Sequence, residues 1–190
     1  MPAPRTLWLV RHAVPLVVRG TCYGRLDLPA DAAATQQAAA TLAAAVPAGA
    51  RLVASPLQRC AQLAEALQVL RPDLRRTGDD SRIAEMDFGD WEGQAWNALD
   101  PAALAAWTAD FARHRPGGGE SVADFLARVG SAWDDLHTDA PATPTVWVTH
   151  AGVIRAATLL AAGRRTVERA TDWPAFPIGF GQWRLQALVT

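Results

Sequence analysis

The chain has 190 residues, half of them hydrophobic and 19% charged, which is typical of one soluble globular domain spanning residues 1–190. Its formal net charge is −1 and it has no block of basic residues, which argues against non-specific nucleic-acid binding. All 18 positive side chains are arginine, so Schiff-base chemistry and a P-loop are excluded, and any anion site must use Arg, His or backbone N–H groups.

The cysteines and the N-terminus bear on the compartment. Cys22 and Cys60 lack the spacing of a zinc or redox pair, so we expect two free thiols in a reducing compartment. The N-terminus does not resemble a signal peptide, and no run of 18 apolar residues is present. We therefore expect a cytoplasmic protein without a membrane partner. The sequence gives no indication of oligomeric state.

The first predicted elements are a strand, a loop and a helix. Residues 6–10 are a short continuous apolar run, as expected of a buried strand. Residues 13–30 contain two prolines and two glycines and predict a long loop. Residues 31–46 are rich in Ala and Leu and predict a helix with Asp31 as its N-cap.

A second strand and a second helix follow. Residues 51–54 predict the strand. Ser55-Pro56 predicts the start of a helix that reaches about residue 70, with Ser as the cap and Pro at the first position. Arg59 would lie in the first turn of this helix. Residues 72–100 are predicted to be irregular.

The remainder of the chain predicts three helices and two strands. We expect a helix at 101–114, a break at 116–119 and an amphipathic helix from residue 120 or 121. The last predicted elements are a strand at 145–149, a helix at 153–162 and a strand at about 181–189. This alternation of strands and helices predicts a three-layer α/β/α fold with a mainly parallel sheet.

Two histidines stand in matching contexts. His12 and His150 each follow a predicted strand and precede an alanine. Sites in open α/β sheets form at the carboxyl ends of strands, so both should lie on one rim. Arg59 would face the same rim and, with Arg11 and a helix N-terminus, would form an anion pocket, because guanidinium groups match phosphate oxygens.

Five segments carry a resemblance to a known family. They are 10–13 (Val-Arg-His-Ala), 55–64 (Ser-Pro-Leu-Gln-Arg-Cys-Ala-Gln-Leu-Ala), 85–93 (Glu-Met-Asp-Phe-Gly-Asp-Trp-Glu-Gly), 118–121 (Gly-Gly-Glu-Ser) and 149–152 (Thr-His-Ala-Gly). In this order they resemble the motifs of the histidine phosphatase superfamily, which includes the cofactor-dependent phosphoglycerate mutases. Each motif alone is weak, but the ordered set is highly specific.

The resemblance implies a phosphoglycerate mutase-like fold and a phosphomonoester hydrolase that uses neither a metal nor a cofactor. It implies that His12 is the nucleophile and forms a phosphohistidine, which requires a neutral imidazole. It implies that Arg11, Arg59 and His150 hold the phosphoryl oxygens. Glu85 would protonate the leaving oxygen and then activate water.

Two positions depart from the family pattern. Ala13 stands where the family usually has Gly after the nucleophile. The added methyl group could crowd or weaken the pocket, but we expect activity to survive. Ala151, expected to line the substrate pocket, replaces the first Gly of the second-histidine motif and is a milder departure.

The segment most informative for the substrate is 20–29 (Gly-Thr-Cys-Tyr-Gly-Arg-Leu-Asp-Leu-Pro). It resembles a loop of the alpha-ribazole phosphatase branch, which acts in cobalamin biosynthesis. The resemblance implies that Tyr23 and Gly24 line the substrate side of the pocket and that the substrate is alpha-ribazole 5'-phosphate, a small-molecule phosphate ester. Such a substrate would suit an aromatic lining, and the chain has eight Trp.

Three alternatives remain open. The chain could be a broad-specificity phosphatase or a phosphoglycerate mutase-like enzyme, although no extended basic segment of the mutase kind is identified. A metal-dependent hydrolase could use His12, His114, His137 and His150, although no metal-binding pair spacing supports it. A non-catalytic phosphoester-binding domain, inactivated by Ala13, is the third.

Overall fold

The computed structural model describes residues 5–138 and 143–188, which build one five-stranded sheet. The strand order is β3-β2-β4-β1-β5. β1 pairs in parallel with β4, and β2 pairs in parallel with β4 and β3, whereas the edge strand β5 is antiparallel to β1. The strands are β1 (Arg5–Arg11), β2 (Arg51–Ala54), β3 (Arg75–Asp79), β4 (Thr145–Thr149) and β5 (Trp183–Leu188).

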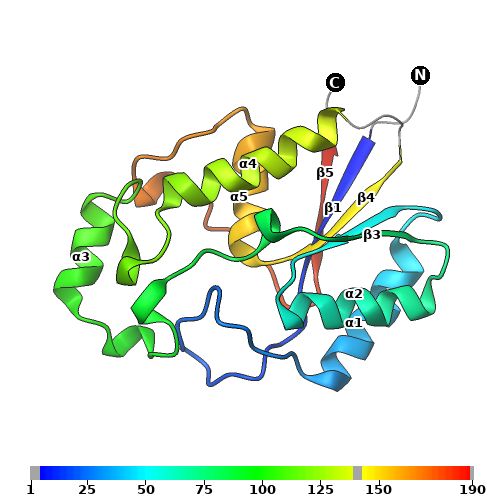
Figure 1. The fold of residues 1–190 in the computed structure, drawn as a ribbon, viewed down its shortest axis with the longest axis horizontal. Helices are drawn as coiled ribbons and strands as arrows, with labels where there is room; N and C mark the ends of the chain where they lie inside the picture. The colour runs from blue at the N-terminus through cyan, green and yellow to red at the C-terminus, as the bar shows by residue number, and fades with distance from the viewer. Residues whose placement is uncertain (1–4, 139–142, 189–190) are drawn as a thin grey trace.

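Helices cover both faces of the sheet (Figure 1). α1 packs against α2 on one face, and α4 packs against α5 on the other. α3 lies at one end of the molecule, away from the sheet (Figure 1). The α-helices are α1 (Ala32–Ala45), α2 (Gln58–Leu70), α3 (Pro101–Ala109), α4 (Val122–Thr138) and α5 (Ala151–Ala161). The 3₁₀ helices are Ser81–Ile83, Gly89–Trp91, Trp96–Ala98, Pro116–Gly118 and Ala170–Asp172.

The central strand β1 separates two halves of the core. Leu7 and Leu9 pack with residues of α4 and α5, whereas Trp8 and Val10 pack with residues of α1 and α2. Successive side chains of a strand point to opposite faces, so a strand covered on both sides is apolar throughout. The predicted three-layer fold with a mainly parallel sheet is confirmed.

The start of α2 corrects one prediction. The helix begins at Gln58 rather than after a Ser55 cap. The Ser55 hydroxyl instead forms a hydrogen bond with the His150 ring. The Asp27 carboxylate accepts the backbone N–H of Gln58 at 2.7 Å, so a residue of the preceding loop satisfies the first amide of the helix.

Two further boundaries differ from the prediction. Residues 72–100 contain β3, a mostly exposed strand without apolar alternation that forms by pairing with β2. The helix predicted at 101–114 ends at Ala109. Phe111 and Ala112 are buried in the turn that follows, whereas α3 itself buries no residue, so ending the helix lets these two side chains enter the core. Asp31 caps α1 as predicted.

None of the helices in the described part of the chain has the length and apolar character needed to cross a bilayer.

Candidate active site

The two strand-ending histidines lie side by side. β1 and β4 are parallel neighbours whose last residues are in register, and the N–H of His12 donates to the carbonyl of Thr149 at 3.0 Å. The His12 and His150 rings are therefore only 5.2 Å apart between centroids. The placement of both histidines on one rim of the sheet, which the sequence predicted, is what the structure shows.

The His12 imidazole is buried and held in one tautomer. Its Nδ1 lies 2.7 Å from the carbonyl oxygen of Ala13, which can only accept, so Nδ1 carries the proton and Nε2 has a free lone pair. Burial first, and then the charges of Arg59 and Arg11, lower the pKa of His12 to about 3. The ring is therefore neutral at physiological pH, as a nitrogen nucleophile must be.

Ala13 fits its position without backbone strain. Its methyl group is buried in the core half that contains Trp8 and Val10. Its φ angle is not positive, so the conformation suits an ordinary residue and does not require Gly. The departure from the family pattern at this position therefore places a methyl group in the core.

His150 is completely buried beside His12. Its Nε2 shares a hydrogen bond of 2.8 Å with the Ser55 hydroxyl, and the Cys60 thiol lies 3.4 Å from the same nitrogen. Burial and the neighbouring His12 and Arg59 hold the pKa of His150 well below its usual value. Ser55 and Cys60 belong to the segment that precedes and opens α2, so this segment fixes the second imidazole.

Arg59 is fully buried and is oriented by the long loop at 13–30. Its guanidinium donates to the carbonyl oxygens of Leu26 at 2.8 Å and Gly24 at 2.6 Å. The same loop is fastened from the other side by the Glu92 carboxylate, which accepts the N–H groups of Arg25, Leu26 and Phe88. A loop without regular secondary structure therefore acts as the frame for Arg59.

Arg11 is the last residue of β1, directly before His12. One guanidinium nitrogen donates to the carbonyl of Ile178 at 2.6 Å, and the group also forms a hydrogen bond with Tyr23. The Tyr23 ring lies 5.4 Å from the guanidinium carbon of Arg59, so this side chain sits between the two cations. Within the described part of the chain, the buried Nε–H groups of Arg11 and Arg59 have no hydrogen-bond partner.

Gly24 is buried where the loop meets the segment 85–93. A Cβ atom at this position would lie 1.8 Å from the carbonyl oxygen of Met86 and 2.7 Å from the Phe88 ring. Only glycine allows this approach. The structure therefore gives Gly24 two contacts, its backbone packing against Met86 and its carbonyl accepting from Arg59.

The Glu85 carboxylate lies against the start of α5, close to the chain that follows His150. It accepts the N–H of Gly152 at 3.0 Å and that of Met86 at 3.1 Å. A Cβ atom on Gly152 would lie 2.2 Å from a Glu85 carboxylate oxygen, so glycine at this position lets the carboxylate stay where it is. The half-buried Ala151 has room for its methyl group.

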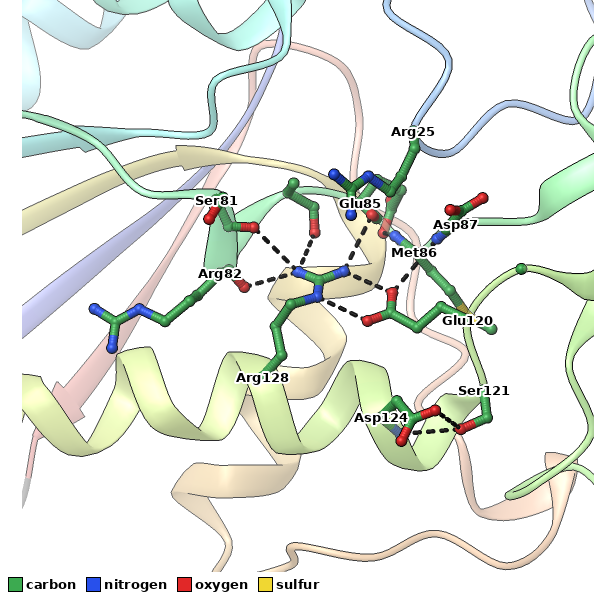
Figure 2. Close-up of polar contacts among 12 residues, drawn as sticks. Arg25, Ser81, Arg82, Glu85, Met86, Asp87, Glu120, Ser121, Asp124 and Arg128 are labelled. Atoms are coloured by element: carbon green, nitrogen blue, oxygen red, sulfur yellow. Dashed lines mark hydrogen bonds and ion pairs between the residues drawn. The ribbon is translucent and has the colours of Figure 1, made fainter.

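An ion pair between Arg128 and Glu120, which sequence reasoning missed, lies beneath Glu85 and holds the backbone of residues 82–85 (Figure 2). Arg128 of α4 donates to the carbonyls of Arg82, Ala84 and Glu85 at 2.8, 2.9 and 3.2 Å. The same guanidinium pairs with Glu120 at 2.7 Å, with both side chains largely buried. Arg128 stands at helical spacing beside the apolar face of α4, and this was the signal available in the sequence.

An aromatic cavity, also missed, opens beside Glu85. Its volume is about 180 Å³. It is lined by Glu85, Met86, Phe88, Trp107, Phe111, Val122, Phe125, Gly152, Arg155 and Trp173. The Trp107 ring organises one wall, stacking on Phe111 at 5.6 Å and meeting Phe88 edge-on at 6.0 Å. The cavity is therefore a mainly apolar space with aromatic side chains, one carboxylate (Glu85) and one guanidinium (Arg155) in its lining.

The cysteines and the remaining histidines lie outside this arrangement of polar groups, except that Cys60 touches His150. Cys22 and Cys60 are free, as predicted, and both are buried. His137 bonds to the carbonyl of Trp133 in α4, and His114 lies in the turn beyond α3. No group of three or more His, Cys, Asp or Glu side chains able to hold a metal ion occurs in residues 5–138 and 143–188, so the alternative four-histidine set is not assembled.

Comparisons with known proteins agree with this geometry. Residues 7–175 match the model of the histidine phosphatase superfamily (branch 1). A mycobacterial glucosyl-3-phosphoglycerate phosphatase is 28% identical with a TM-score of 0.76, over 95% of this chain and 89% of that one. The protein TTHB049 from Thermus thermophilus is 30% identical with a TM-score of 0.69, over 97% of both chains. Among curated protein sequences, no significant match was found.

Proposed function

Because the chain belongs to the histidine phosphatase superfamily and is a phosphatase, we propose that it hydrolyses a small phosphomonoester through a phosphohistidine at His12. One observation carries this proposal: the His12 ring is neutral, its Nδ1 proton is held by the carbonyl of Ala13, its Nε2 lone pair is free, and it lies within the electrostatic influence of Arg59 and Arg11. The fold and the family both fit this reaction, and the site residues take the roles described in the next two paragraphs.

In the first step, Nε2 of His12 attacks phosphorus and the bond from phosphorus to the ester oxygen breaks. Glu85, in its acid form, gives its proton to the departing oxygen. Arg11, Arg59 and His150 stabilise the charge on the phosphoryl oxygens, and the unpartnered Nε–H groups of the two arginines are donors of the required kind.

In the second step, the Glu85 carboxylate takes a proton from water while that water attacks phosphorus. The bond between phosphorus and Nε2 breaks, and inorganic phosphate leaves. Arg11, Arg59 and His150 serve both steps, so no residue has to move between them. Tyr23, Gly24 and Ala151 would line the substrate-binding pocket, with Tyr23 and Gly24 on its substrate side.

For the substrate we propose a phosphate ester with a flat, ring-bearing leaving group, with alpha-ribazole 5'-phosphate as the first candidate. The aromatic cavity supports this choice, because it adjoins the carboxylate assigned to protonate the leaving oxygen. The resemblance of residues 20–29 to the alpha-ribazole phosphatase loop supports it independently. The likeness to a glucosyl-3-phosphoglycerate phosphatase makes a sugar phosphoglycerate the second candidate.

A comparison of kcat/KM on alpha-ribazole 5'-phosphate, glucosyl-3-phosphoglycerate and 3-phosphoglycerate, in excess chelator, tests this proposal. We expect alpha-ribazole 5'-phosphate to be preferred by at least about tenfold, and Trp107→Ala to remove about that factor for this substrate alone. Trp96→Ala is the matched control, because Trp96 is half-buried in the same aromatic cluster but does not line the cavity. Equal or better use of either phosphoglycerate ester would contradict the substrate proposal.

A further inference from the structure

The segment 178–182 reaches the active site although it lies beyond the residues that match the family model, 7–175. β5 is antiparallel to β1, with Trp183 opposite Val10, so the chain enters the sheet beside the end of β1. The N–H of Gly181 donates to the carbonyls of Arg11 and His12 at 3.1 and 3.0 Å. The N–H of Arg11 donates to the carbonyl of Gln182 at 2.9 Å, so the backbone of this segment is locked to the nucleophile's own strand.

Phe180 covers one face of the Arg11 guanidinium. The guanidinium carbon lies 3.8 Å from the centre of the Phe180 ring, a close cation–π contact. The carbonyl of Ile178 and the Tyr23 side chain hold Arg11 on other sides. The Phe180 ring therefore completes the set of contacts that fixes where the Arg11 donors point.

The same ring also flanks the nucleophile. The Phe180 and His12 rings are 5.5 Å apart between centroids, and Phe180 remains 37% exposed. Its turn is built for this position, because Gly181 has a φ angle of +71° that ordinary residues rarely adopt. An exposed aromatic ring is thus held over two polar groups of the site.

We propose that Phe180 is a positioning residue for phosphoryl transfer, which acts by fixing the Arg11 guanidinium against the phosphoryl group on His12. This inference rests on the proposed function for the identity of the reacting atoms. Loss of the aromatic face would leave Arg11 free to turn and would let water reach it, weakening the field on the phosphoryl oxygens.

The test compares Phe180→Leu, which keeps an apolar cover without a π face, with Phe180→Tyr, which keeps the face. We expect Phe180→Leu to lower kcat and weaken vanadate binding by about tenfold each, with KM nearly unchanged. Phe180→Tyr should stay within about twofold of wild type. Leu185→Ala is the control, because Leu185 is an exposed apolar residue of β5 outside the site, and thermal unfolding checks that each variant is folded.

A double-mutant cycle with Arg11→Lys identifies the route of the effect. If Phe180 acts through the guanidinium, the combined variant should lose little more than Arg11→Lys alone. Multiplied losses, or wild-type values for Phe180→Leu, would overturn the inference. The vanadate affinity, measured by calorimetry, tests the role of Phe180 even if the wild-type protein hydrolyses none of the esters. Turnover by His12→Ala, in contrast, would contradict only the proposed function.

Discussion

The proposed phosphate side of the site and the proposed leaving-group side are built in different ways. His12, His150 and Arg59 follow strand ends or lie in the first turn of a helix, are at most 2% exposed, and are fixed by hydrogen bonds to backbone or to buried side chains. The cavity beside Glu85 is instead lined by residues of α3, α4, α5 and the connecting loops. The phosphate side suits a chemical step that is the same for every substrate. The leaving-group side can change its shape through single side chains without disturbing the sheet.

The substitution with the largest expected effect removes the imidazole of the phosphate side. His12→Ala should lower kcat by on the order of 10⁴-fold or more, because it removes the nitrogen that forms the covalent bond in the proposed mechanism. The factor should be similar for an aryl phosphate and for alpha-ribazole 5'-phosphate, since the nucleophile serves both. His137→Ala, an exposed histidine of α4, is the control. Residual turnover near wild type in a steady-state assay would argue against covalent catalysis.

A smaller effect should distinguish the two sides. Gly152→Ala places a methyl group against the Glu85 carboxylate and forces it to move. We expect kcat to fall about 100-fold for an alkyl ester, whose leaving oxygen needs a proton, and far less for an aryl ester with an acidic leaving group. Glu85→Gln should show the same dependence.

The control for this substitution is Gly130→Ala in α4, where the added methyl group would meet its nearest neighbour at 3.5 Å. Equal losses on both classes of ester would assign the damage to the phosphate side and would count against the role of Glu85.

The smallest expected effect concerns stability. The pKa of His12 is about 3 in the folded protein and near 6.5 in an unfolded chain, so between these values only the unfolded state binds the proton. The free energy of unfolding should therefore decrease as the pH falls from about 6.5 toward 3, by up to about 1.4 kcal/mol per pH unit for this group. His150 acts in the same direction. Well above pH 6.5 neither state is protonated, and these groups add no pH dependence.

Urea unfolding of wild type and His12→Ala at about pH 7 and about pH 5 checks this expectation. The variant should lose less stability on acidification than wild type. An equal decrease in both proteins would mean that the His12 ring gains a proton as readily when folded as when unfolded.

Sequence reasoning reached the phosphate side because local patterns determine it. The apolar runs at 6–10 and 145–149 predicted buried parallel strands, and parallel strands bring their carboxyl ends, with His12 and His150, to one rim. Arg59 followed from its place just after a strand. These inferences need only residues that are close in the chain.

Contacts between distant segments could not be predicted in this way. Asp27 satisfies the first amide of α2 from 31 residues away, and this shifted the start of the helix. Arg128 contacts carbonyls more than 40 residues away, and its spacing alone fits an ordinary solvated helix face. Phe180 belongs to no motif, because its place depends on the antiparallel pairing of β5 with β1.

The fastening of the 13–30 loop has a consequence for protein engineering. Because Glu92 accepts two amides of this loop and Arg59 donates to two of its carbonyls, grafting a foreign loop here would displace Arg59, a cation of the proposed site, as well as the loop residues proposed to line the substrate pocket. Mutant libraries aimed at new leaving groups are better confined to the aromatic cavity walls around Trp107 and Trp173. A change of shape there leaves the loop that holds the Arg59 guanidinium intact.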